Sequence, residues 1–171
     1  MNFETTTDED DDLVEETGAA DAIELLTADH EDVKLLFNSY EDLVSDGGSA
    51  GDRVALATQI CHALIAHTTA EEEIFYPAAR EAIEQTELLD QAEAEHGNAK
   101  ALIAQIQQMD PADVQYDATV MQLQEAVDQH VHEEEGELFP RVQESDIDLH
   151  LLGEQIAQRK EEVLAELDES D

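Results

Sequence analysis

HTTAEEEIFYP, residues 67–77, is the stretch that decides the fold, because a related stretch, HVHEEEGELFP, follows at residues 130–140. The two copies align without a gap at an offset of 63 residues. Each opens with a His-x-x-x-Glu spacing, His67 with Glu71 and His130 with Glu134. Residues four apart lie one turn apart on the same helix face, so each pair directs two metal-ligating side chains to one place. The repetition predicts two related helical units.

A single histidine precedes each copy of this stretch. Asp29 and His30 come 37 residues upstream in the first unit, counted from His30 to the next motif histidine, and Glu95 and His96 come 34 residues upstream in the second. Each unit is therefore predicted to be a helical hairpin with one histidine on its first helix and His-x-x-x-Glu on its second. Two such hairpins, related by a pseudo-twofold axis, predict an up-down-up-down four-helix bundle.

Apolar residues recur in steps of three and four along five segments, which is the period of an α-helix. We expect helices over about residues 23–44, 51–84, 87–109, 112–140 and 146–167. The last is an additional C-terminal helix that packs outside the bundle, caps an open end or mediates a dimer. Pro77 should kink or end the second helix. No segment alternates with a period of two, so the predicted fold class is all-α.

The chain is predicted to divide into three parts. Residues 1–17 are polar and acidic and should be disordered. Residues 18–143 should form the four-helix domain, and residues 144–171 the C-terminal amphipathic helix with an acidic tail.

The inward faces of the four helices carry six candidate metal ligands: His30, His67, Glu71, His96, His130 and Glu134. Buried carboxylates cost several kcal/mol each unless they are paired or bound to metal, and the inward stripes hold no Arg. Two octahedral ions offer about twelve positions. Four imidazoles, two bridging glutamates and a bridging oxide or hydroxide leave one open position per metal for oxygen, peroxide or another small ligand. These ligand types suit iron, and also manganese or zinc, whereas a structural zinc site would more often use thiolates.

The combined pattern resembles the hemerythrin-like family, which is built on the HHE cation-binding domain. Its marks run in the family's order from residue 23 to 142: LLTADHEDVKLLF (25–37), HTTAEEEIFYPAAR (67–80), AEAEHGNAKAL (92–102) and HVHEEEGELFPRV (130–142). The resemblance implies a four-helix bundle holding a non-haem di-iron site. It also implies roles in oxygen binding or sensing, iron handling, or defence against peroxide and nitric oxide.

The sequence departs from the oxygen-carrying branch of that family, which has a second histidine one turn after the third-helix ligand and an Asp in the last motif. Here Lys100 and Glu134 take those places. One imidazole fewer favours sensing or oxidation chemistry over reversible oxygen carriage. The alternatives are a peroxidase- or catalase-like enzyme and an iron storage or homeostasis protein. A ferritin-like di-iron site would need Glu-x-x-His on two helices, and only Glu93 with His96 fits.

Other polar residues have competing interpretations. Lys34 and Lys100 each lie four residues after a candidate ligand, either as surface partners of acidic neighbours or, for Lys100, as a partner of Glu137 near the site. Glu137 could also be an extra ligand. The remaining assignments are surface or structural roles for His62, His132 and His150; a small core residue at Cys61; outer partners of the ligands or solvated acids at Glu72, Glu73 and Glu135; and core or pocket lining at Phe37, Leu64, Phe75, Ile103 and Leu138.

The charge excludes several classes of partner. Asp and Glu number 45 against 7 Lys and Arg, a net charge of −38, so the chain should bind neither nucleic acid nor an anionic membrane surface. The spread of acid along the chain favours the high-salt cytoplasm of an extreme halophile, where the Debye length shrinks to about 3 Å, over a polyanionic decoy such as a DNA mimic. A single cysteine fits a reducing compartment, and no signal peptide is visible, so a cytoplasmic location is expected.

Overall fold

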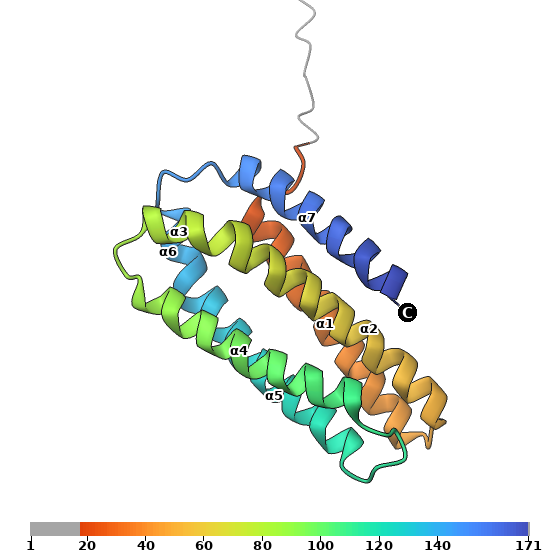
Figure 1. The fold of residues 1–171 in the computed structure, drawn as a ribbon. Helices are drawn as coiled ribbons and strands as arrows, with labels where there is room; N and C mark the ends of the chain where they lie inside the picture. Colours follow the sequence, from red (N-terminus) through yellow and green to blue (C-terminus); the bar gives the residue numbers. More distant parts are fainter. Residues whose placement is uncertain (1–17, 171) are drawn as a thin grey trace, which may run out of the picture.

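The computed structural model describes residues 18–170, and all regular structure in that range is helical (Figure 1). The predicted all-α class is therefore confirmed. The segment 1–17, expected to be disordered, lies outside the described residues.

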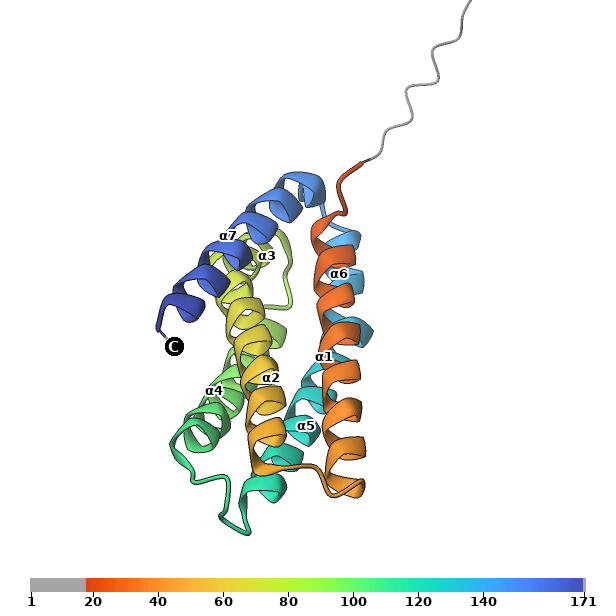
Figure 2. The same ribbon diagram turned by 90° about the vertical axis from the view of Figure 1, so that its right-hand side faces the viewer.

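Four long helices form the bundle: α1 (Ala22–Ser45), α2 (Ala50–Ala70), α4 (Glu87–Gln108) and α5 (Tyr116–Glu133). Helices α1 and α2 form one hairpin, and α4 and α5 form the other (Figure 1). The hairpins pack through α2 against α4 and through α1 against α5 (Figure 2). The helices alternate in direction, as predicted for an up-down-up-down bundle.

Local sequence signals set the ends of the first hairpin's helices. Asp21 caps α1 by accepting a hydrogen bond from the Glu24 N–H at 2.9 Å, while the Glu24 carboxylate accepts one from the Asp21 N–H at 3.0 Å. Gly47 adopts a φ of 73° just beyond the end of α1, a conformation that favours glycine. Ser49 then caps α2.

Each hairpin's second helix contains a π-helical turn that continues into a further short helix. In the first hairpin α2 leads into η1 (Glu71–Phe75) and α3 (Tyr76–Ala82), and in the second α5 leads into η2 (Glu134–Leu138) and α6 (Phe139–Gln143). Pro77 does not end the helix. It lies in the first turn of α3, directly after the π-helical turn, and a missing backbone N–H is tolerated at that position.

The π turns shift the buried face by one residue. α-Helical spacing from Glu71 puts Ile74 and Ala78 inward, but the fully buried residues are Phe75 and Ala79. Ile74 and Ala78 are partly buried and pack against the same apolar cluster, so the wider turn moves the centre of the buried face by one residue. The same turn places Tyr76 in the interior.

The bundle core consists of two apolar clusters. Phe37, Leu64 and Ile103 belong to the one toward the α1–α2 loop, and Phe75 and Leu138 to the one that includes α3 and α6. All five were expected in the core. Between the clusters along each long helix lies a layer that contains the six predicted ligands.

The additional C-terminal helix, α7 (Leu149–Ser170), packs on the outside of the first hairpin against α1 and α2 (Figure 1). It buries Leu152, Ile156 and Val163. Gly153 allows the close approach, because a Cβ there would lie 2.6 Å from the Ala20 carbonyl oxygen. Within residues 18–170, no helix has both the length and the apolar composition needed to cross a bilayer.

Candidate metal centre

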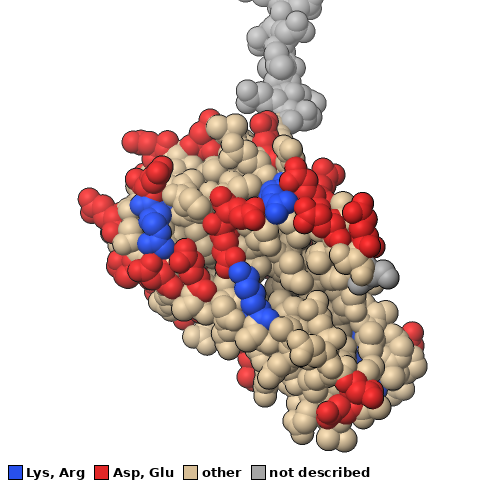
Figure 3. Space-filling model, viewed as in Figure 1, with Lys and Arg blue, Asp and Glu red and all other residues tan. Residues whose placement is uncertain are grey.

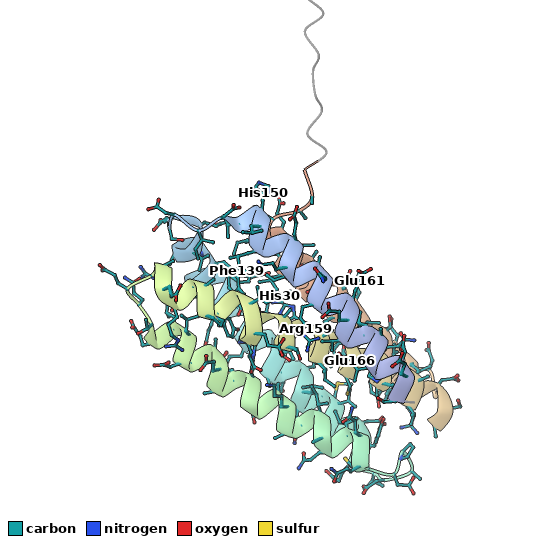
Figure 4. All side chains as sticks on the ribbon, turned by 45° about the horizontal axis from the view of Figure 1, so that its top comes forward. His30, Phe139, His150, Arg159, Glu161 and Glu166 are labelled. Atoms are coloured by element: carbon teal, nitrogen blue, oxygen red, sulfur yellow. The ribbon has the colours of Figure 1, made fainter. Side chains whose placement is uncertain are left out.

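All six predicted ligands lie buried in one layer at the middle of the bundle. Their exposed fractions are 7% for His30, 4% for His67, 0% for Glu71, 1% for His96, 8% for His130 and 2% for Glu134. The four long helices and the two π turns each contribute to this layer. Figure 4 places His30 in the interior of the bundle, with Phe139 beside it.

The six side chains form two groups that share both glutamates. Group A consists of His30, His67, Glu71 and Glu134, and group B consists of His96, His130, Glu71 and Glu134. In group A, His67 Nε2 lies 3.1 Å from Glu71 Oε1, and His30 Nε2 lies 3.3 Å from Glu134 Oε1. In group B, His96 Nε2 lies 2.9 Å from the Oε2 atom of Glu71.

The remaining histidine completes group B. His130 Nε2 lies 3.3 Å from Glu134 Oε2. Each carboxylate thus turns one oxygen to each group, so each group could hold a cation with both glutamates among its ligands. Each group takes both of its histidines from a single hairpin.

The donor atoms of group A fit a cation. Four of its buried atoms have no hydrogen-bond partner: His30 Nε2, His67 Nε2, Glu71 Oε1 and Glu134 Oε1. An unsatisfied buried polar group costs about 1–3 kcal/mol. One cation among the four atoms would satisfy all of them at once.

Charge supports the same conclusion. Burial alone would raise the pKa of Glu71, but His67 and His96 hold it well below its ordinary value, so the carboxylate is ionised. Burial would lower the pKa of His67, but the carboxylates of Glu71 and Asp29 outweigh burial and raise it to about 10. Without a metal, the ionised carboxylates of the layer are therefore balanced by protonated imidazoles, and a bound cation would take the place of these protons.

Every ligand histidine is held from behind by a carboxylate at its Nδ1 atom. The four pairs are His30 with Glu135 at 3.0 Å, His67 with Asp29 at 2.9 Å, His96 with Glu72 at 3.3 Å and His130 with Glu95 at 2.7 Å. Such pairing fixes the ring and its tautomer and leaves Nε2 free to bind metal.

These outer carboxylates connect the two hairpins. Asp29 and Glu95 each hold a histidine of their own hairpin, whereas Glu72 and Glu135 each hold a histidine of the other. Lys160 of α7 forms an ion pair with Asp29, so the C-terminal helix also supports the centre.

Of the two interpretations of Lys100, the surface partner of an acidic neighbour is confirmed and the pairing with Glu137 is wrong. Lys100 is half exposed and forms its ion pair with Glu72. α-Helical spacing from His130 put Glu137 on the ligand face, but η2 rotates it to the surface, where it lies outside both groups.

Tyr76 is a residue of this layer that the sequence analysis missed. Its hydroxyl donates to Glu134 Oε2 at 2.6 Å and lies 3.1 Å from both Glu71 Oε2 and His96 Nε2. Burial and then the two carboxylates raise the pKa of Tyr76 well above its ordinary value. The 63-residue offset pairs Tyr76 with Phe139, and this polar-for-apolar difference between the copies was the available signal.

A small cavity adjoins the layer on the side of the cluster that contains Phe37. Its volume is about 30 Å³, and the four ligand histidines line it together with apolar side chains that include Val33, Leu64 and Ala99. A site for one water needs roughly 10–15 Å³. The cavity therefore accommodates a ligand of very few heavy atoms.

Among the described residues, the other candidates lie outside the two groups. His132 and His150 are exposed, His62 is half-buried, and Cys61 is buried in the core as expected. Glu93 is exposed and pairs with Arg80, so the ferritin-like spacing does not contribute a ligand.

Comparisons with known proteins agree with this geometry. Residues 21–142 match the family model described as the Hemerythrin HHE cation binding domain. The crystal structure of a Hemerythrin HHE cation binding domain-containing protein from Mycobacterium kansasii has the same fold, with a TM-score of 0.73 at 24% identity. That match covers 86% of this chain and 89% of the mycobacterial one. A comparison with curated proteins found no match.

Proposed function

Because the chain belongs to the hemerythrin HHE cation-binding domain family, we propose that it is a non-haem di-iron protein that binds or senses oxygen or a related small oxidant. One observation carries the proposal: Glu71 and Glu134 each divide their two oxygens between two histidine pairs. This division supports two ions bridged by both glutamates and by an oxide or hydroxide. Imidazole with carboxylate suits iron, with manganese and zinc as the competing metals.

The chain's own residues have distinct tasks in this proposal. Iron, when bound, supplies the redox chemistry and the affinity for a small oxidant. The outer carboxylates orient the histidines, and the cavity of about 30 Å³ limits the ligand to the size of oxygen, peroxide or nitric oxide. Val33, Leu64 and Ala99 make part of its wall apolar, which suits an uncharged ligand.

A peroxide-consuming enzyme is the second candidate, favoured by one observation. The four ligand histidines line a cavity of about 30 Å³, which leaves room for a molecule as small as peroxide beside the centre. Peroxidase- or catalase-like turnover requires such access for peroxide.

The proposal also includes a high-salt cellular environment. Figure 3 shows Asp and Glu side chains over one face of the molecule, with few Lys and Arg among them. With a net charge of −38, this surface supports a halophilic cytoplasm. A homodimer through α7 would use Leu151 and Leu164, which are 51% and 38% exposed, because the helix's main apolar face is buried within the chain.

Anaerobic loading with ferrous iron followed by metal analysis tests the proposal. We expect two ions per chain in the native protein and at most one in Glu71→Gln and in Glu134→Gln. The matched control is Glu137→Gln, an exposed acid of the same π turn as Glu134, which should keep two ions. Fewer than two ions in the native protein, or equal losses in the control, would contradict the proposal.

Treating the iron-loaded protein with oxygen, nitric oxide or peroxide then distinguishes the sensing, enzymatic and storage roles. A reversible absorption change with oxygen or nitric oxide supports binding or sensing. Catalytic loss of peroxide supports the enzyme, and release of iron supports storage. A protein that loads two ions and responds to none of these ligands would refute all three roles.

A further inference from the structure

The layer of ligands contains a polar group that the ligand count above leaves unused, the phenol of Tyr76. This side chain is fully buried and comes from the turn that follows η1. Its oxygen lies 2.6 Å from Glu134 Oε2, 3.1 Å from Glu71 Oε2 and 3.1 Å from His96 Nε2. All three of these atoms belong to group B.

These distances are those expected between neighbouring ligands of one ion. Two donor atoms each about 2.1 Å from a metal and at right angles to one another are about 3 Å apart. The His96 and His130 Nε2 atoms, which group B would use for its ion, are themselves 3.1 Å apart. Two of the three phenol distances, to Glu71 Oε2 and His96 Nε2, match this spacing, and the shorter one to Glu134 Oε2 is a hydrogen bond that the hydroxyl donates while no ion is bound.

Group A has no counterpart of this oxygen. The repeat puts Phe139 in the equivalent position, where its ring stacks on His30 with the centroids 5.9 Å apart and the planes 3° apart. The four unsatisfied donor atoms described above all belong to group A, whereas Tyr76 satisfies the Oε2 atoms of group B. The two positions thus differ by one oxygen donor, although the rest of the repeat is symmetric.

We propose that Tyr76 is a seventh protein ligand, bound to the ion at the His96–His130 position, and that it makes the two metal positions unequal. The position that it serves has two imidazoles and three oxygens from the protein. The His30–His67 position has two imidazoles and two oxygens, and is therefore the more open of the two. It also lies next to Phe139, whose ring offers no donor. The inference rests on the proposed dinuclear site and adds to it which position takes the external ligand.

Tyr76→Phe tests this assignment, with Tyr116→Phe as the matched control. Tyr116 is also buried, but lies in the apolar cluster away from the layer. Ferric iron bound by a phenolate absorbs in the visible range, so the native protein should show this band after aerobic oxidation. Tyr76→Phe should lose it and the control should keep it.

A metal titration gives a second readout that does not depend on activity or on iron. With zinc in competition with a chromophoric chelator, Tyr76→Phe should leave one binding step unchanged and weaken the other by about tenfold or more, the range found when a supporting group is removed from a metal site. Tyr116→Phe should leave both steps unchanged. Thermal unfolding of the metal-free variants checks that each one folds.

The outcomes separate this inference from the function beneath it. A native protein that binds fewer than two ions refutes the dinuclear proposal. Two ions in the native protein, with the band and both titration steps retained in Tyr76→Phe, overturn the tyrosine ligand and leave the dinuclear site standing. Equal weakening of both steps also overturns it, because a ligand of one position acts on that position.

Discussion

At the scale of single residues, the centre depends on carboxylates that never touch the proposed ions. Asp29 shows the principle: it lies behind His67, accepts from its Nδ1 atom at 2.9 Å, and is held in turn by Lys160. A fixed ring points Nε2 into the layer without loss of rotational freedom when metal binds. The acid therefore contributes to affinity through orientation.

Removing this support should weaken metal binding at the His30–His67 position. Asp29→Asn is expected to lower affinity there by about 10–100-fold, because the ring loses a charged acceptor that fixes its tautomer. A competition titration measures the effect, and Glu161→Gln, an exposed acid on α7, serves as the control. An unchanged affinity in Asp29→Asn would show that packing alone holds the ring.

Cys61 should be chemically inert in the folded protein. It is 1% exposed, and burial raises the pKa of its thiol to about 11. At pH 8 only about one thiol in a thousand would then be ionised, and the thiolate is the reactive form. A disulfide reagent should react slowly with native protein and quickly in denaturant, with the native rate rising as pH approaches 11. Rapid labelling of the native protein at pH 8 would contradict this prediction.

At this scale the sequence predicted that the six side chains would lie together, because groups that can bind one metal must follow the helical spacing. His-x-x-x-Glu on a helix leaves one geometry, and two copies with upstream histidines brought all six side chains into one layer. Among the outer carboxylates, Glu72 and Glu135 were named with solvated acids as the alternative, and the structure places both behind candidate ligand histidines. Spacing could not decide between the alternatives, because with 45 acidic residues in the chain an acid near each histidine carries little signal.

At the scale of helices, apolar periodicity predicted where the long helices run but did not predict the π turns within them. The long helices followed the 3.6-residue period, so their limits were predicted to within a few residues. A single extra residue in η1 leaves nearly the same apolar pattern, because both the α-helical and the shifted positions carry apolar side chains. Tyr76 was missed for this reason: α-helical spacing does not place it on the ligand face.

Two glycines test how helices α4 and α7 are packed. Gly97 lies exposed on α4 with nothing within 4 Å of an added Cβ, so Gly97→Ala should stabilise the protein by about 0.5–1 kcal/mol. At Gly153 an added Cβ would meet the Ala20 backbone oxygen at 2.6 Å, so Gly153→Ala should destabilise it by about 1–3 kcal/mol. Denaturant unfolding of both variants at one salt concentration gives the comparison. A stabilising Gly153→Ala would mean that α7 does not lie against the start of α1.

At the scale of the whole molecule, repulsion among the acidic side chains destabilises the folded state, whereas burial of the apolar core stabilises it. The net charge of −38 is spread over the chain, while the layer at the centre adds buried carboxylates that need counter-charge. Sequence composition alone was enough to predict this conflict. The convergence of the two glutamates at the centre was predicted as well, and the structure adds which carboxylate oxygen faces which pair of histidines.

Stability should therefore rise with salt. Between about 0.1 M and about 1 M potassium chloride the Debye length falls from about 10 Å to about 3 Å, which screens repulsion among the surface acids. The unfolding midpoint at fixed pH should increase over this range and continue to rise at higher salt. Sucrose, which favours burial without screening charge, should have a smaller effect. Equal effects of salt and sucrose would indicate that surface repulsion is not the limiting factor.

Glu72 of the first hairpin pairs with His96 of the second, and Glu135 of the second hairpin pairs with His30 of the first. If the hairpins separated, each would keep the support of one histidine, through Asp29 or Glu95, and lose the support of the other. Loss of a bound metal and separation of the hairpins are therefore expected to be coupled. A metal held by Glu71 of one hairpin and Glu134 of the other would link the two halves, and its retention would then report how firmly they hold together.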